Sequence, residues 1–98
     1  MSLEDITTQV KKAVGQMPSL GKSIKIQLDT GFVHIDLTGD EGIVTNEDNP
    51  ADCTVITTEE TLVGLKTGSV NPMMAMMSGK IKIKGDMGLA MKLQSLLS

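Results

Sequence analysis

At 98 residues the chain can bury one hydrophobic core and little more. Its net charge of −3 and a single aromatic residue, Phe32, argue against a nucleic-acid-binding protein, which needs a basic surface and, for single strands, stacking aromatic rings. No apolar run approaches the roughly 20 residues that span a bilayer, and the first residues lack the pattern of a signal peptide. The lone Cys53 fits a reducing compartment, so we expect a cytoplasmic protein.

The first element is predicted to be an amphipathic helix. Its apolar residues recur at spacings of three and four, which places them on one face. Ser2 and Asp5 match a capping box at its start, and Gly15 and Pro18 are expected to end it. The apolar stripe consists of Leu3, Ile6, Val10, Ala13, Val14 and Met17.

Four strands are predicted to follow. Residues 24–28 and 32–37 alternate apolar and polar side chains around a short glycine-containing turn, which is typical of a β-hairpin. Residues 43–45 and 53–57 are further apolar runs, separated by a polar loop. In this pattern His34, the only histidine, lies on the outward face of its strand.

A second helix is predicted after the fourth strand. Thr57 and Glu60 match another capping box, and Gly68 is expected to end the helix. Its spacing predicts three buried residues, which are Leu62, Val63 and Leu65.

The last third of the chain is rich in methionine and lysine. Asn71 and Pro72 predict the start of a short methionine-rich helix, which Gly79 ends. Residues 80–84 alternate lysine and isoleucine, so they predict a strand whose two isoleucines point inward. Asp86 is expected to cap a final helix. No repeat or linker interrupts this order, so residues 1–98 are expected to form one free-standing α+β domain with about five strands packed by helices.

The final helix is too apolar for an ordinary surface helix. Its apolar residues spread over roughly 220° of the helical wheel, whereas packing one face requires a stripe of about 100°. Such a helix must be buried on two sides, face a partner or cover a ligand. Gln94 falls inside the apolar sector, so either protein groups or a ligand must satisfy its amide, and both interpretations are open. The apolar residues are Met87, Leu89, Ala90, Met91, Leu93, Leu96 and Leu97.

This region resembles the C-terminal signature of the sterol carrier protein 2 family. The resemblance implies a five-stranded, mixed but mostly antiparallel sheet with helices on one side and an apolar tunnel between them. It also implies binding or transfer of sterols, fatty acids, acyl-CoA esters or phospholipids without catalysis, with the C-terminal helix near the tunnel mouth. The matching residues are Asn71-Pro72, Ala75 and Gly79-Lys80-Ile81-Lys82-Ile83-Lys84-Gly85-Asp86-Met87-Gly88-Leu89-Ala90-Met91-Lys92-Leu93-Gln94.

Six of the eight methionines lie between Met73 and Met91, where they either fill the core or contact a ligand. Some family members have glutamine at the positions that match Met73 and Met91, so the cavity expected here is softer and more aliphatic. The ligand-binding residues that we predict are Met73, Met77, Ile81, Ile83, Met87, Ala90, Met91 and Gln94.

Several alternatives stay open at this point. The lysines of the last third either form a solvated face or attract anionic lipid head groups or a CoA phosphate. The final helix either closes a ligand cavity or docks on a partner or a second copy, and the chain would then serve as an interaction module or an accessory to a lipid-metabolising enzyme. We expect a monomer or weak dimer. No cofactor or metal is expected, because one histidine and one cysteine offer neither a ligand set nor a nucleophile with a neighbouring base.

Overall fold

The computed structural model describes the backbone of residues 2–16 and 21–97, and the side chains of residues 2–16 and 21–92. None of the helices within these ranges has the length and apolar character that a bilayer span requires. In chain order the elements are α1 (Leu3–Val14), β1 (Ser23–Leu28), β2 (Gly31–Asp36), β3 (Ile43–Thr45), β4 (Cys53–Ile56), α2 (Glu59–Thr67), α3 (Pro72–Met77), β5 (Lys82–Gly85) and α4 (Met87–Leu97).

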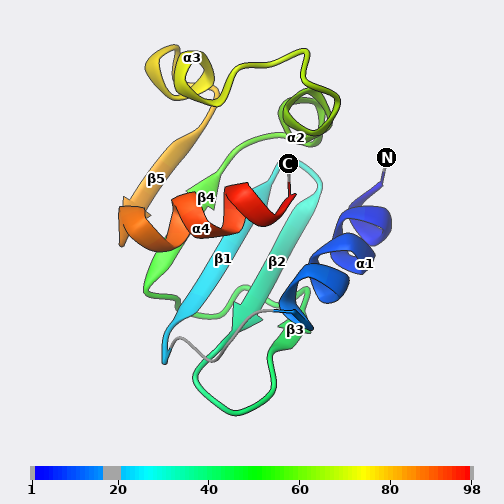
Figure 1. The fold of residues 1–98 in the computed structure, drawn as a ribbon, viewed down its shortest axis with the longest axis vertical. Coiled ribbons are helices and arrows are strands. Elements are labelled where there is room, and N and C mark those ends of the chain that lie inside the picture. Colours follow the sequence, from blue (N-terminus) through cyan, green and yellow to red (C-terminus); the bar gives the residue numbers. More distant parts are fainter. Residues whose placement is uncertain (1, 17–20, 98) are drawn as a thin grey trace.

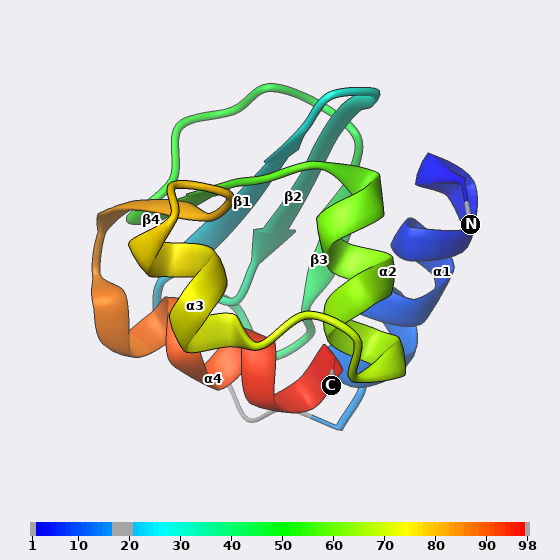
Figure 2. The same ribbon diagram turned by 90° about the horizontal axis from the view of Figure 1, so that it is seen from above.

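The strands form one mixed sheet in the order β3-β2-β1-β4-β5. β1 and β4 run parallel, and every other neighbouring pair is antiparallel. The helices gather on one side of this sheet, with α4 crossing in front of the central strands in Figure 1 and the helical layer seen edge-on in Figure 2. The predicted α+β class, with a five-stranded and mostly antiparallel sheet, is therefore confirmed.

One face of the β1–β2 hairpin forms part of the hydrophobic core. Ile24 and Ile26 of β1 are buried, and Ile35 and Val33 of β2 stand opposite them in the antiparallel register. Because side chains alternate between the two faces of a strand, all four point toward the helices. This is the face that the alternation in the sequence predicted.

Helix α1 packs against β2 and β3. The Ser2 hydroxyl accepts the Asp5 N–H at 3.2 Å, and the Asp5 carboxylate accepts the Ser2 N–H at 3.1 Å, so the predicted capping box is confirmed. Gly15 is the C-cap, whereas Met17 and Pro18 lie outside the described residues. The buried apolar residues of the helix are Ile6, Val10 and Val14.

The start of α2 lies one residue later than predicted. Thr58, and not Thr57, is the N-cap, and its hydroxyl accepts the N–H of Thr61 at 3.1 Å. The Thr57 hydroxyl instead donates to the carbonyl of Lys80 at 3.0 Å, which ties the end of β4 to the segment before β5. Two adjacent threonines offer the same capping chemistry, and the long-range contact decides between them.

The buried face of α2 also differs from the prediction. Leu62, Val63 and Leu65 are only half-buried, and the buried residues are Thr61 and Gly64. The chain after α2 folds back so closely that a Cβ on Gly64 would lie 2.3 Å from the Val70 side chain. This close contact at Gly64 explains why a glycine, rather than a leucine, occupies a buried position.

The remaining differences concern the edge strand and the histidine. β5 spans Lys82–Gly85, so it begins two residues later and ends one residue later than the alternation predicted, and Ile81 precedes it. His34 does point away from the helices, beside Lys25 on the paired strand, but it is buried. Its Nε2–H donates to the carbonyl of Pro50 at 3.0 Å, because the loop after β3 covers this part of the outer face.

The junction between β5 and α4 requires glycine. Gly85 has φ +92°, and a Cβ there would lie 2.1 Å from the carbonyl oxygen of Asp52. Gly68 has φ +83° but open space around it. Gly68→Ala should therefore lower the free energy of unfolding by about 1 kcal/mol through backbone strain alone. Gly85→Ala should cost about 3 kcal/mol, because overpacking adds to the strain.

Urea denaturation of the two variants measures both losses. Equal losses would show that the approach of Gly85 to Asp52 is not as close as described.

Candidate functional site

Helix α3 is attached to the fold by one buried residue, Ala75. The helix begins because the Asn71 side-chain oxygen accepts the N–H of Met73 at 2.9 Å. After the helix ends, the Ala75 carbonyl accepts the N–H groups of Lys80 at 2.9 Å and Ile81 at 3.2 Å. These bonds connect α3 to the segments on either side of it, and three of its six side chains, those of Met73, Met74 and Met77, are exposed.

Helices α3 and α4 carry five exposed methionines, which we refer to together as the methionine surface. Figures 1 and 2 place both helices on the same side of the sheet, with α3 where the chain enters β5 and α4 beginning where it leaves. Among the large apolar residues whose side chains the structure describes, only Ile43, on the opposite edge of the sheet, is also exposed. The exposed fractions are 71% for Met73, 64% for Met74, 81% for Met77, 49% for Met87 and 63% for Met91.

The first turns of α4 are buried on one side only. Leu89 and Ala90 belong to the core, whereas Met87, Met91 and Lys92 are exposed. Met87 and Met91 lie four residues apart, so they share one stripe of the helix. Burial on two sides is therefore wrong as an explanation for the apolar character of these turns. Two explanations for these apolar residues remain, which are contact with a partner and contact with a ligand.

The eight predicted ligand residues fall into two groups. The four methionines among them are exposed, and Ile81 and Ala90 are buried. Ile83 is half-buried, stands opposite Val55 of β4 and packs against the same core cluster as Ala90. The side chain of Gln94 lies outside the described residues. The structure thus brings exposed methionines and buried aliphatic residues to the same edge of the sheet, and their contact with a ligand stays a prediction.

The start of α4 is fixed by Asp86. Its Oδ1 accepts the N–H groups of Gly88 at 3.0 Å and Leu89 at 3.3 Å, so the predicted cap is confirmed. Its Oδ2 lies 2.6 Å from the Lys22 ammonium. The Lys22 side chain, followed by the backbone N–H of Leu89, holds the pKa of Asp86 below its usual value, and Asp86 in turn raises the pKa of Lys22.

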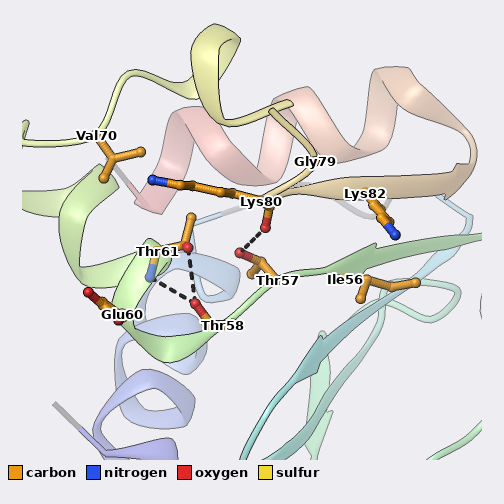
Figure 3. Close-up of a pocket in the computed structure, with 9 residues that line it drawn as sticks. All are labelled: Ile56, Thr57, Thr58, Glu60, Thr61, Val70, Gly79, Lys80 and Lys82. Atoms are coloured by element: carbon orange, nitrogen blue, oxygen red, sulfur yellow. Dashed lines mark hydrogen bonds between the residues drawn. The ribbon is translucent and has the colours of Figure 1, made fainter. Parts of the chain in front are cut away.

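A pocket that no sequence signal indicated lies between α2, the end of β4 and the segment leading into β5. It has a volume of about 470 Å³, a size that suits a small organic ligand. Figure 3 shows Lys80 lying across its top above Thr61, with Lys82 and Ile56 at the other end. The residues that line the pocket come from segments far apart in the sequence, so the local sequence pattern could not predict the pocket. The lining residues are Ile56, Thr57, Thr58, Glu60, Thr61, Val70, Gly79, Lys80 and Lys82.

The described residues offer neither an activated nucleophile nor a set of metal ligands. Cys53 is fully buried, and burial, with the nearby charge of Asp86, raises the pKa of its thiol, which disfavours the reactive thiolate. His34 is engaged with Pro50 on the other face of the sheet. No group of three or more potential metal-ligating side chains occurs within the described ranges.

The chain is similar in sequence to one known family and to several curated proteins. The model of the SCP-2 sterol transfer family matches residues 3–98. Sterol carrier protein 2 of Bos taurus is 48% identical over 58 residues, which cover 59% of this chain and 11% of that protein. Hydroxysteroid dehydrogenase-like protein 2 of Danio rerio is 41% identical over 70 residues, which cover 69% of this chain and 17% of that protein. The chain therefore spans only a small part of these curated relatives.

Solved structures show the same fold. The sterol carrier protein domain 2 of Helicoverpa armigera superposes with a TM-score of 0.73 at 28% identity, covering 95% of this chain and 83% of that one. Sterol carrier protein 2 of Aedes aegypti, solved with palmitate, superposes with a TM-score of 0.68 at 16% identity and covers 100% and 97% of the two chains. At that identity the second likeness concerns the fold alone.

The cap and the ion pair of Asp86 can be separated by two variants. Asp86→Asn keeps a capping side chain and loses the ion pair, whereas Asp86→Ala loses both. The melting temperature at pH 7 should therefore fall in the order wild type, Asp86→Asn, Asp86→Ala. Because the folded pKa of Asp86 is lowered, its stabilising effect is complete above the unfolded pKa of about 3.9 and is lost as the pH falls through the folded value.

Thermal unfolding between pH 2 and pH 7 checks this dependence. The gap between the wild type and Asp86→Asn should close at the acid end, while Asp86→Ala should stay below Asp86→Asn throughout. A gap that is constant across this range would contradict the assigned pKa direction.

Proposed function

Because this chain belongs to the SCP-2 sterol transfer family, we propose that it is a non-catalytic carrier that binds apolar lipids and transfers them. The ligand classes are fatty acids, acyl-CoA esters, phospholipids and sterol-like molecules. The sterol carrier protein 2 relatives support the sterol-like class, and the palmitate complex of the Aedes aegypti protein supports the fatty acids. The observation that carries the proposal is the methionine surface beside the buried aliphatic residues of β5 and α4.

A lipid chain lying against this surface would remove exposed apolar atoms from water. Met73 and Met77 of α3 and Met87 and Met91 of α4 would contact it on two sides, and Ile83 would lie on the sheet side. Burial of each CH₂ group contributes about 0.8 kcal/mol before the costs of binding are subtracted. Methionine side chains are flexible and polarizable, so they adapt to chains of different shape.

The proposal assigns the C-terminal part of α4 to the closure of an apolar tunnel between the helices and the sheet. Gln94 is the polar residue that would contact the ligand or the backbone there. Since the chain has no tryptophan or tyrosine, the tunnel would select for apolar character more than for one ring system. The SCP-2 fold at low sequence identity supports the architecture, and the ligand contacts are our proposal.

The proposal also includes the oligomeric state, location and partners of the carrier. Residues 1–98 act as one lipid-binding domain, monomeric or weakly dimeric, and the free, buried thiol of Cys53 supports a cytoplasmic location. The partners are the lipid itself and, transiently, an anionic membrane surface.

A second function is favoured by the exposure of Met87 and Met91. In this alternative α4 docks on a protein partner or a second copy, and the chain acts as an interaction module or an accessory to a lipid-metabolising enzyme. An exposed apolar stripe on one helix fits such contacts as well as it fits a lipid.

Native mass spectrometry of protein purified without detergent tests the carrier function. We expect a mass increase that corresponds to one bound lipid, which organic extraction removes and which a fluorescent fatty acid can replace. If no lipid co-purifies and the fluorescent fatty acid binds no better than it binds to an unrelated protein of similar charge, the carrier proposal is wrong.

Substitution at two equally exposed methionines locates the ligand. Met91→Gln should weaken binding of the fluorescent fatty acid by about fivefold, since loss of apolar contact costs about 1 kcal/mol. Met74→Gln, at a residue outside the predicted ligand set, should leave this affinity unchanged. Both variants should keep the melting temperature, because Met91 and Met74 are 63% and 64% exposed. A dimer in light scattering that Met91→Gln dissociates, with unchanged fatty-acid binding, would favour the second function instead.

A further inference from the structure

We propose that the pocket between α2, the end of β4 and the segment leading into β5 binds a small organic dianion whose two anionic groups are separated by a short carbon chain. A linear dicarboxylate is the simplest member of this class. The inference goes beyond the carrier function and does not depend on it. Among the side chains that the structure describes, none of the predicted ligand residues lines this pocket, so the pocket is a second site.

The pocket has a lysine ammonium at each end. Figure 3 shows the Lys80 side chain lying across the top of the pocket above Thr61, and Lys82 beside Ile56 at the other end. Within the part of the chain that the structure describes, neither ammonium makes an ion pair. Because Coulomb attraction falls with distance, two cations that lie apart match a ligand with two separated anionic groups better than a ligand with one.

The backbone positions both lysines. The Lys80 N–H donates to the carbonyl of Ala75 at 2.9 Å, and the Lys80 carbonyl accepts the Thr57 hydroxyl at 3.0 Å. Lys82 extends from β5 at the position opposite Ile56 of β4. The points from which the two side chains extend are therefore fixed before a ligand arrives, which lowers the ordering cost of binding.

The hydroxyl of Thr61 adds a donor beneath Lys80. Thr61 is buried, and its Oγ1 accepts the Thr58 O–H at 3.0 Å, while the Thr58 Oγ1 accepts the Thr61 N–H at 3.1 Å. The Thr61 O–H has no acceptor among the described residues, so it can donate to a ligand. An ammonium and a hydroxyl donor on the same side of the pocket require an accepting, anionic group such as a carboxylate.

The size of the pocket and its aliphatic residues indicate an organic ligand. The volume of about 470 Å³ suits a small organic molecule, whereas a water molecule takes up about 30 Å³ in the liquid. Ile56 and Val70 are half-buried and offer contacts for a carbon chain. Glu60 lies at the margin of the pocket in Figure 3, on the side away from Lys82, and two lysines against this one acid leave the lining positively charged.

Titration with adipate, a linear dicarboxylate, followed by nuclear magnetic resonance at low salt tests the proposal. The backbone N–H signals of Thr61, Val70 and Gly79, which line the pocket, should shift. Hexanoate has the same number of carbons but one carboxylate, so it should bind about fivefold more weakly. Lys80→Gln and Lys82→Gln should each lower the affinity for adipate by about fivefold, because each removes one of the two ion pairs.

Matched controls remove the same charge outside the pocket. Lys84 lies two residues from Lys82 on the same exposed face of β5, and Lys66 lies in the last turn of α2. Lys84→Gln and Lys66→Gln should bind adipate as the wild type does. Glu60→Gln should instead strengthen adipate binding by about twofold, since it removes the acid at the margin. Equal affinities for adipate and hexanoate, or equal losses in the pocket and control variants, would overturn the proposal.

Binding of the fluorescent fatty acid separates this inference from the proposed function. Saturating adipate should leave the affinity for the fatty acid unchanged, because the two ligands use different residues. Displacement of the fatty acid by adipate would contradict a second site. A protein that binds adipate through Lys80 and Lys82 but binds no fatty acid would support the pocket and contradict the carrier function alone.

Discussion

The position of α4 over the sheet depends on three chain segments that meet at Asp52. The Asp52 carboxylate accepts the N–H of Ser23 at 2.9 Å, where β1 begins, and its carbonyl accepts the N–H of Asp86 at 3.3 Å, where α4 begins. Lys22 adds the ion pair to Asp86. The parallel strands β1 and β4 and the last helix are thereby joined at one corner. Gly85 makes this possible, because any side chain there would collide with the same carbonyl.

The joint at Asp52 also explains the contrast between the two helices that carry the methionines. α4 is fixed at its first turn by Asp86 and by the burial of Leu89 and Ala90, whereas α3 has only Ala75 in the core. Segments with few buried contacts open at low free-energy cost. Of the two walls proposed for the ligand, α4 is thus the fixed one and α3 the one that can adjust.

Local chemistry made much of the fold predictable from the sequence. Alternation over residues 24–28 and 32–37 identified the face of the hairpin that is buried, and Ser2 and Asn71 identified two helix starts, because capping and pleating involve near neighbours. Long-range contacts were not predictable. The choice of Thr58 over Thr57 as N-cap depends on the carbonyl of Lys80, and the burial of His34 depends on a loop 16 residues away. The site shows the same division. The family resemblance selected four methionines as ligand residues, but neither it nor the sequence pattern predicted that their side chains are exposed. The pocket between α2 and the segment leading into β5 was not predicted either.

Exposed thioethers and a buried thiol give this protein an unusual response to oxidants. A cysteine is ordinarily oxidised before a methionine, but Cys53 is shielded from solvent and its raised pKa keeps it protonated. The side chains of Met73, Met74 and Met77 on α3 are exposed instead. Peroxide would therefore convert methionine to its sulfoxide first, and each added oxygen would turn apolar surface polar. Enzymatic reduction of the sulfoxides would restore the apolar surface. Oxidants would therefore change the surface of the molecule while its core stays intact.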